Sequence, residues 1–322
     1  MFVSSFFIGG INLMTFLIPT KQVVIMFILM VIGWLCYKVK FLHEQTSKDL
    51  TKILLYVVSP CLIINSFKQR LTTTRLIQFG VLLVLITFIF IFKILVSHFL
   101  FSRIRNEQER TVLKYAGTYT NAGFMGIPLV QAILGSTGVF FAVPYLICYN
   151  IFMWTHGINM FQKNHTSLAD HFRQVSTNPN IIAAIIGLIV FITQFKIPTL
   201  IATPMNYIAD INTPLSMIVI GTNLGSINLK KDLINPNVWF GVFVRNIFFP
   251  LCVLGILTIT PLTQTAKLAV LIMAACPVAG VVVLFSLMSG YDVKFPTKLM
   301  CISTLVAVIT IPLMICLGML AL

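Results

Sequence analysis

Long apolar runs separated by short polar segments make up almost the whole chain. A helix needs about 20 mostly apolar residues to cross the hydrocarbon core of a bilayer. Ten runs approach or exceed this length, and they cover residues 22–40, 48–67, 76–101, 111–134, 138–161, 178–195, 202–226, 237–259, 265–288 and 296–321. No polar gap between them could hold a soluble domain. The pattern therefore predicts an all-α membrane protein with about ten transmembrane helices.

The composition supports a lipid environment. Of the 322 residues, 58% are hydrophobic and only 9% are charged, whereas soluble domains carry about 25% charged residues. So few charges cannot cover a water-facing surface of this size, and the lipid bilayer is the main expected partner. We expect a multi-pass protein of the cell membrane, of the bacterial inner-membrane type.

The positive charges lie mainly on one side of the predicted spans. Most Lys and Arg residues fall in the segments 38–52, 103–114, 163–173, 230–231 and 294–298, and the others lie at 21, 68–75, 196 and 267, apart from two inside the runs. Because loops rich in Lys and Arg stay in the cytoplasm, both termini are predicted outside. The same bias accounts for the net charge of +14 without a nucleic-acid partner.

The first twenty residues form an apolar extension before the first run. They contain Gly9, Gly10 and Asn12, and they lack the basic start and cleavage site of a signal peptide. We expect an outer extension of the first helix or an interfacial segment. An eleventh span is the alternative, and it would move only the N-terminus to the cytoplasm.

Matched prolines indicate an internal repeat. The second run of each half carries Pro60 or Pro214, and the fourth run carries Pro128 or Pro277 beside small residues. An odd number of spans in each half makes the second repeat inverted in the membrane. The predicted division is residues 21–161 for the first five-helix repeat, 162–177 for a cytoplasmic loop and 178–322 for the second repeat.

Broken helices at equivalent places in inverted repeats are the best sequence indication of a transporter's binding site. Proline lacks an N–H group, and freed backbone groups at membrane depth persist only where protein or a watery cavity satisfies them. The N-terminus of a half-helix carries partial positive charge and free N–H donors, which suit an anion. The pattern therefore predicts a secondary transporter for a small organic anion, either a dicarboxylate or a monocarboxylate.

At these prolines the chain resembles the auxin efflux carrier family, which includes bacterial malate and malonate permeases and plant auxin exporters. The resemblance extends over all but the first twenty residues. The long cytoplasmic loop of the plant exporters is absent, which favours the permease branch. The matching segments are Asn121-Ala122-Gly123-Phe124-Met125-Gly126-Ile127-Pro128-Leu129, Ser59-Pro60-Cys61-Leu62, Asn178-Pro179 and Thr213-Pro214-Leu215.

This resemblance implies a fold similar to bile-acid symporters and sodium/proton antiporters, with two inverted repeats and crossed broken helices. Runs one, two, six and seven would form a scaffold, through which such proteins often form homodimers. The other six runs would form a domain that moves by elevator-type alternating access. The implied substrate-binding residues are Asn121, Gly123, Phe124, Gly126 and Pro128 at one crossover, and Pro277, Val278 and Gly280 at the other.

Three charged residues lie at membrane depth, away from the ends of the runs, where each costs at least ~2.5 kcal/mol. Lys93 and Arg245 occupy partner runs of the two repeats, and together they would suit a carboxylate. Alternatively, Lys93 snorkels to the membrane boundary and Arg245 pairs with Asp210. A buried Asp210 would be able to carry a coupling proton, whereas Asp210 in a loop would not.

Both a proton and sodium are candidates for the coupling ion. No carboxylate accompanies the crossover, so sodium would need backbone carbonyls and hydroxyls such as those of Thr118 and Thr120. The seven cysteines occur singly and without a CxxC pair, so we expect neither a metal site nor a cofactor.

Other functions fit the sequence less well. His43-Glu44 begins like a zinc-protease helix but lacks the second His, and no Gly-x-Ser-x-Gly elbow is present. An enzyme is therefore not expected. A channel would need a repeated filter or a ring of like charges. The main alternative is a sodium-coupled symporter of the bile-acid type, because it would share the fold.

Overall fold

The computed structural model describes residues 7–8, 11–161, 173–225 and 235–322. The described part is almost entirely helical, which confirms the expected all-α membrane protein. Two short strands, β1 (Phe7–Ile8) and β2 (Ile11–Asn12), pair antiparallel just before the first helix. Most of the predicted cytoplasmic loop 162–177 and parts of the N-terminal extension lie outside the described residues.

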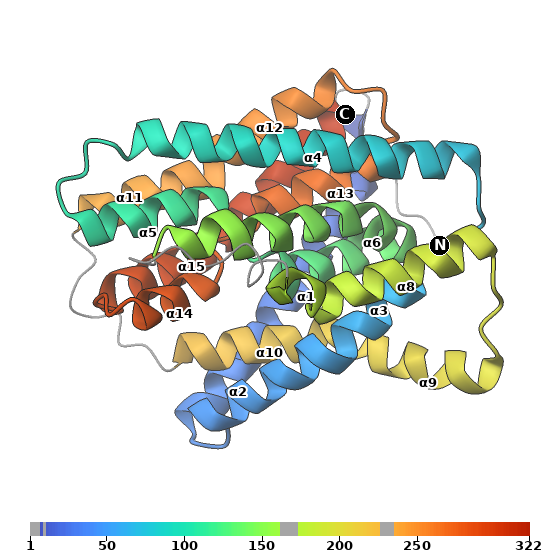
Figure 1. Ribbon diagram of the computed structural model, residues 1–322, viewed down its shortest axis with the longest axis horizontal. Coiled ribbons are helices and arrows are strands. Elements are labelled where there is room, and N and C mark those ends of the chain that lie inside the picture. The colour runs from blue at the N-terminus through green and yellow to red at the C-terminus, as the bar shows by residue number, and fades with distance from the viewer. Residues whose placement is uncertain (1–6, 9–10, 162–172, 226–234) are drawn as a thin grey trace.

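Every predicted apolar run coincides with helical structure (Figure 1). The first half contains α1 (Leu13–Lys38), α2 (Glu44–Ile53), the π-helical turn η1 (Leu54–Val58), α3 (Ser59–Ser66), α4 (Thr73–Leu100), α5 (Glu107–Thr118), η2 (Ala122–Gly126), α6 (Ile127–Phe152) and η3 (Met153–Gly157). The second half contains α8 (Pro179–Thr193), α9 (Thr199–Asp210), α10 (Asn212–Gly225), α11 (Pro236–Phe243), η5 (Val244–Phe248), α12 (Phe249–Thr258), α13 (Gln264–Ala275), α14 (Val281–Met288) and α15 (Lys294–Ala321).

Six of the described helical segments are long and apolar enough to cross a membrane, and α8 and α13 are shorter apolar helices. One of the six, residues 122–157, contains a sharp kink. Gly135 there has φ 65° and ψ −161°, which divides α6 into two helical parts. Glycine adopts this positive φ without the steric cost that a Cβ would bring.

The prolines that indicated the repeat all lie where a helix starts or is interrupted. Pro60 and Pro128 occupy the first turns of α3 and α6. Pro214 lies in the first turn of α10, and Pro277 lies between α13 and α14. Pro60 and Pro128 each follow a π-helical turn inside a continuous helical segment, where the helix is already irregular. For Pro214, in the first turn of α10, the missing N–H group costs little.

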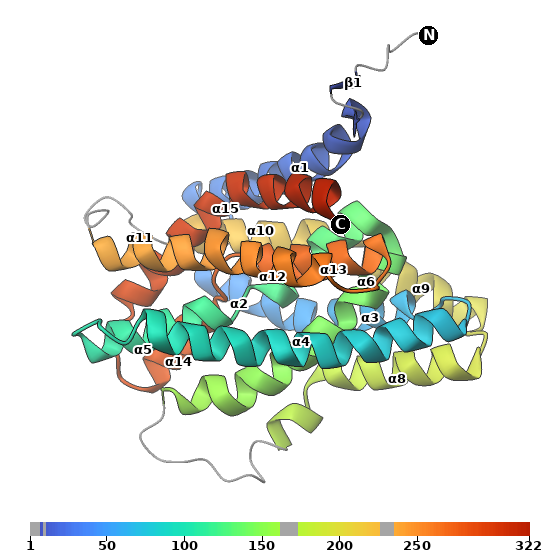
Figure 2. The same ribbon diagram turned by 90° about the horizontal axis from the view of Figure 1, so that it is seen from above.

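The helices pack in two groups around α6 (Figures 1 and 2). In one group α10 packs along α1, and α3 packs on α8 and α9. In the other group α13 packs on α6, and α4, α5, α11, α12, α14 and α15 lie around this central pair. Figure 1 shows α2, α3, α9 and α10 on one side of α6, and α4, α11 and α12 on the other.

The backbones of α1 and α10 touch through two glycines. A Cβ added at Gly221 would lie 1.9 Å from the carbonyl oxygen of Met30. One added at Gly33 would lie 2.2 Å from the carbonyl oxygen of Ile218. Small residues allow such close approach between membrane helices, where packing rather than the hydrophobic effect drives association.

Candidate functional site

Two helix breaks lie against one another near the centre of the protein. One separates α5, which ends at Thr118, from η2, and the other separates α13 from α14. Thr120 and Val278 form an antiparallel β-bridge across the two breaks. The N–H of Asn121 donates to the carbonyl of Pro277 at 2.8 Å, and the N–H of Ala279 donates to the carbonyl of Tyr119 at 3.2 Å. Backbone groups freed from one helix are thus satisfied by the other.

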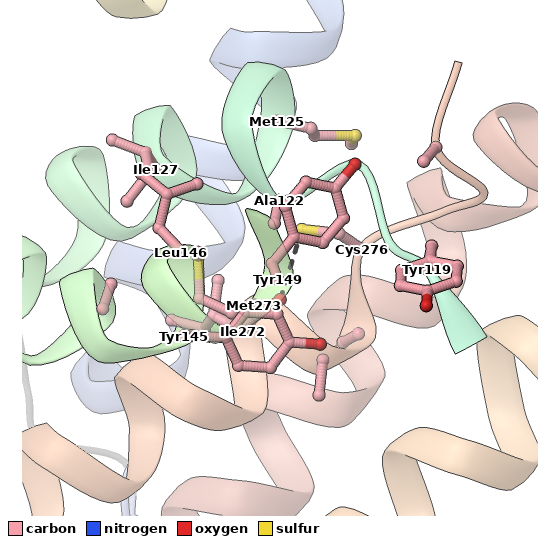
Figure 3. Close-up of a cluster of buried hydrophobic side chains, with 14 of the residues drawn as sticks. Tyr119, Ala122, Met125, Ile127, Tyr145, Leu146, Tyr149, Ile272, Met273 and Cys276 are labelled. Carbon is pink, nitrogen blue, oxygen red and sulfur yellow. Dashed lines mark hydrogen bonds between the residues drawn. The ribbon is translucent and has the colours of Figure 1, made fainter. Parts of the chain in front are cut away.

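Small and apolar side chains allow this close contact. A Cβ at Gly126 would lie 2.7 Å from the sulfur of Met273 on the facing helix. Figure 3 shows Met273, Cys276 and Tyr145 gathered beside Ala122. The Cys276 thiol donates to the carbonyl of Ile272 at 3.3 Å within its own helix. The breaks are therefore enclosed by protein, as unpaired backbone at membrane depth requires.

Arg245, in η5, binds the C-terminal ends of both half-helices that lead into the breaks. Its side chain is fully buried. One terminal nitrogen, Nη1, donates to the carbonyls of Gly117 at 3.0 Å and Thr118 at 3.5 Å, and Nη2 donates to the carbonyl of Ala274. Helix C-termini carry partial negative charge and unpaired carbonyls. One guanidinium therefore offsets the partial negative charge at the C-termini of two helices.

The structure separates Arg245 from Asp210. Asp210 is exposed at the end of α9, whereas Arg245 is buried among backbone carbonyls. The alternative in which these two residues form an ion pair is therefore wrong. The burial that a proton-carrying Asp210 would need is also not found.

Lys93, in α4, is fully buried beside the breaks. Its ammonium donates to the hydroxyl of Tyr145 at 3.1 Å and lies 5.5 Å from the centre of the Phe90 ring. The Tyr145 hydroxyl lies 3.5 Å from that of Thr120, so Lys93 reaches the bridge between the breaks. The alternative in which Lys93 snorkels to the membrane boundary is therefore wrong.

The two buried cations have no described carboxylate partner. The ion pair found within the described ranges is Lys52 with Asp49, at the protein surface. Lys93 lies close enough to Arg245 to interact with it electrostatically. Two positive charges without acidic partners favour a negatively charged ligand nearby.

A buried polar network beside the breaks was not predicted from sequence. The Ser303 hydroxyl, from α15, accepts from the N–H of Val278 at 3.0 Å and donates to Oδ1 of Asn246 at 2.6 Å. The Asn246 amide nitrogen donates back to the carbonyl of Ser303 at 2.8 Å. Isolated Ser and Asn residues are common in apolar runs, so only the position of Asn246 beside Arg245 offered a signal.

We expect replacement of Ser303 by alanine to destabilise the protein. The change leaves the N–H of Val278 and Oδ1 of Asn246 without their partner, and each buried unsatisfied group costs about 1–3 kcal/mol. Ser286→Ala is the matched control, because this buried hydroxyl donates only to the carbonyl of Val282 in its own helix. Thermal unfolding in detergent should show a clearly lower midpoint for Ser303→Ala than for Ser286→Ala. Equal midpoints would contradict this role of Ser303.

The N-terminus of η2 is a partly open end of the first break. Asn121 is the N-cap residue and is half-buried, and no hydrogen bond of its side chain is described. The first N–H groups of a helix lack partners within it, and here they belong to residues around Gly123 and Phe124. Phe124 packs against a cluster of η1 and α10 that includes Val58 and Val219. This helix end therefore faces the boundary between the two groups of helices.

The second break also contains the N-terminus of a helix, α14. Gly280 is the N-cap residue of α14 and is exposed, whereas Val278 and Ala279 beside it are buried.

The other predicted crossover residues make contacts around the breaks. Pro128 contacts the other group of helices, because its carbonyl accepts from the Thr213 hydroxyl at 3.4 Å. Thr118 and Thr120 are buried, and their hydroxyls contact Ser97 and Tyr145 respectively. The predicted crossover residues thus gather in one region.

These features define a multi-pass membrane protein with two broken helices that meet in its interior. A family model described as "Membrane transport protein" matches residues 18–174 and 165–315. The chain belongs to this family of transporters, the auxin efflux carrier family, as the sequence motifs predicted.

Two archaeal proteins are similar along nearly their whole length. An uncharacterised transporter of Methanocaldococcus jannaschii is 23% identical over 309 residues, which cover 92% of this chain and 98% of the relative. An uncharacterised transporter of Methanothermobacter thermautotrophicus is 23% identical over 306 residues, which cover 93% and 98%. These relatives support the assignment to membrane transport and do not indicate a substrate.

Proposed function

We propose that the protein is a secondary transporter that moves a small organic anion, a dicarboxylate or a monocarboxylate. The observation that carries the proposal is the pair of helix breaks with two buried cations beside them and no described carboxylate partner. Half-helix N-termini and fixed positive charge in a site of low dielectric favour a carboxylate over a cation.

The proposed arrangement has ten spans in two inverted five-helix repeats, residues 21–161 and 178–322. Equivalent features at matched positions support it. The break after α5 corresponds to that after α13, and Lys93 in α4 corresponds to Arg245 in η5. The second run of each half is irregular just before its proline, at η1 and at Ile211. In this arrangement both termini lie outside a bacterial-type inner membrane.

The proposed substrate site is the open side of the breaks. Asn121, Gly123 and Phe124 supply one helix N-terminus, and Gly280 supplies the other. Gly126, Pro128, Pro277 and Val278 shape the breaks. Arg245 acts by holding the two half-helices, since its guanidinium already binds their carbonyls. Lys93 contributes charge through Tyr145 and Thr120.

The proposed mechanism is elevator-type alternating access. The helices around α6 and α13 move as one body against a scaffold of α1, α3, α8, α9 and α10, through which two copies form a dimer. The Phe124 contact with η1 and α10 lies on the sliding boundary. The coupling ion is a proton or sodium, and a sodium-coupled symporter of the bile-acid type is the competing assignment.

Electrogenic transport in proteoliposomes tests the proposal. Malate, malonate, succinate, a monocarboxylate and a bile acid are applied to wild type and to Asn121→Ala. We expect a current with at least one carboxylate, and a loss of about tenfold or more in Asn121→Ala, because the N-cap group that meets the anion is removed. Sodium-dependent current with the bile acid alone would favour the competing assignment.

Asn206→Ala is the matched control, because Asn206 is exposed on α9, away from the breaks. It should transport at the wild-type rate. A current that is unchanged in Asn121→Ala would retain the transporter and refute the site. Because electroneutral exchange carries no current, uptake of the labelled anion into liposomes loaded with unlabelled anion completes the test.

A further inference from the structure

A separate pocket, lined by five polar side chains together with Ile94 and Met160, lies between α4, α5 and η3. Its volume is about 220 Å³, enough for several waters or a small ligand. Helical spacing brings the lining together: Thr111, Lys114 and Thr118 occupy one face of α5, and His98 and His156 approach from α4 and η3. Each of these five residues carries a polar side chain. No Asp or Glu contributes to the described lining.

Hydrogen bonds to neighbouring groups hold several side chains of this pocket in place. The Lys114 ammonium lies 3.2 Å from Nδ1 of His98. An ammonium only donates, so Nδ1 accepts and the proton of a neutral His98 ring resides on Nε2, which has no described partner. The Tyr119 hydroxyl donates to the carbonyl of Phe152 at 2.9 Å. Nδ1 of His156, 2.9 Å from that hydroxyl, therefore donates to it, which fixes the ring and leaves Nε2 of a neutral His156 as an acceptor. Arg110 lies close enough to Lys114 to add positive potential.

The pocket adjoins the helix breaks but does not include them. Thr118 lines it and is the last residue of α5, and its carbonyl accepts from Arg245. Tyr119, which contacts His156, is the first residue of the break. The crossover residues Asn121, Gly123 and Gly280 do not line the pocket. It lies beside the last turns of α4, at the end of that helix that the charge bias predicts to be near the cytoplasm.

We propose that this pocket is a second anion-binding site, distinct from the crossover, that takes a small carboxylate. Lys114 supplies the charge, and Nε2–H of His98 and the hydroxyl of Thr111 supply hydrogen-bond donors. Thr118, whose hydroxyl donates to the carbonyl of Lys114, and His156 complete the lining. A bound anion there stands one residue away from the break, on the path between the predicted cytoplasmic side and the crossover. The site stands on its own geometry, independently of which substrate is transported.

Calorimetric titration with malonate in detergent, in buffer without competing anions, tests the proposal. The Asn121→Ala background weakens binding at the crossover, so malonate binding that remains in this background and depends on Lys114 is assigned to the pocket. We expect Asn121→Ala to retain malonate binding, and Asn121→Ala/Lys114→Gln to weaken it at least tenfold. Asn121→Ala/Lys48→Gln is the matched control, because Lys48 is exposed on α2 outside the pocket and the charge change is identical.

Histidine NMR provides a readout without substitutions in the pocket. In protein labelled at its five histidines, malonate should shift the ring signals of His98 and His156 and leave that of His43, the exposed N-cap residue of α2, unchanged. Equal malonate affinity with and without Lys114, or unshifted His98 and His156 signals, would overturn the proposal. Binding of sulfate with no binding of malonate would overturn the carboxylate assignment. Transport activity is measured separately, so a failure here leaves the proposed function intact.

Discussion

Replacing Arg245 by methionine is expected to abolish transport and to lower the stability of the protein. The substitution leaves the carbonyls of Gly117 and Ala274 at buried helix ends without a donor. Each such group costs about 1–3 kcal/mol, and the partial negative charges of two helix C-termini are no longer compensated. Removing a buried charge also saves desolvation free energy. We expect the loss to exceed this saving, because one side chain serves two helices.

Arg245→Lys separates charge from geometry. An ammonium retains the positive charge but lacks the planar fork that reaches two helix ends at once. We therefore expect stability and transport between those of wild type and Arg245→Met. Arg105→Met is the matched control, because Arg105 is exposed in the segment before α5. Thermal midpoints in detergent and uptake into proteoliposomes provide the two readouts. If Arg245→Met matched wild type in both, the guanidinium would not hold the breaks together.

Replacing Gly221 by alanine is expected to force α1 and α10 apart. The new Cβ would lie 1.9 Å from the Met30 carbonyl oxygen, which is backbone and cannot rotate aside. Overpacking against side chains costs about 1–3 kcal/mol, and we expect a larger loss here because a whole helix must shift. Since the Thr222 hydroxyl lies 3.4 Å from the Gly33 carbonyl, the shift also weakens the neighbouring contact.

Gly80→Ala is the matched control for this helix pair. Gly80 lies within α4, and a Cβ there meets nothing within 4 Å. Gly→Ala at a compatible helical position stabilises by about 0.4–1 kcal/mol through the unfolded state. The thermal midpoint should thus fall strongly for Gly221→Ala and stay level or rise for Gly80→Ala. Similar midpoints for the two variants would show that the contact between α1 and α10 relaxes easily.

Much of the fold was predictable because it depends on local chemistry. The apolar runs coincide with helices since a run of this length lowers its free energy only by satisfying its own backbone within lipid. Pro128 and Pro277 predicted interruptions because neither residue has an N–H group to donate. The break after α5 begins just beyond Thr118 and includes Asn121, where the sequence motif predicted it.

The roles of the buried cations were less predictable. Lys93 and Arg245 were identified as intramembrane charges, but the sequence left open whether Lys93 snorkels and whether Arg245 pairs with Asp210. In the structure Lys93 donates a hydrogen bond to Tyr145, and Arg245 donates to the carbonyls of Gly117 and Ala274. Hydrogen bonds to backbone carbonyls cannot be predicted from residue types, because every residue has a backbone carbonyl.

The sequence by itself determined the class of protein, the positions of the helix breaks and the family, because hydropathy and proline chemistry act within a few residues. Only the tertiary structure decided which groups meet. The Thr120–Val278 bridge, the network of Ser303 and Asn246, and the pocket around Lys114 each join distant parts of the chain. Such contacts depend on how whole helices pack, and a side chain's own identity does not specify its partner.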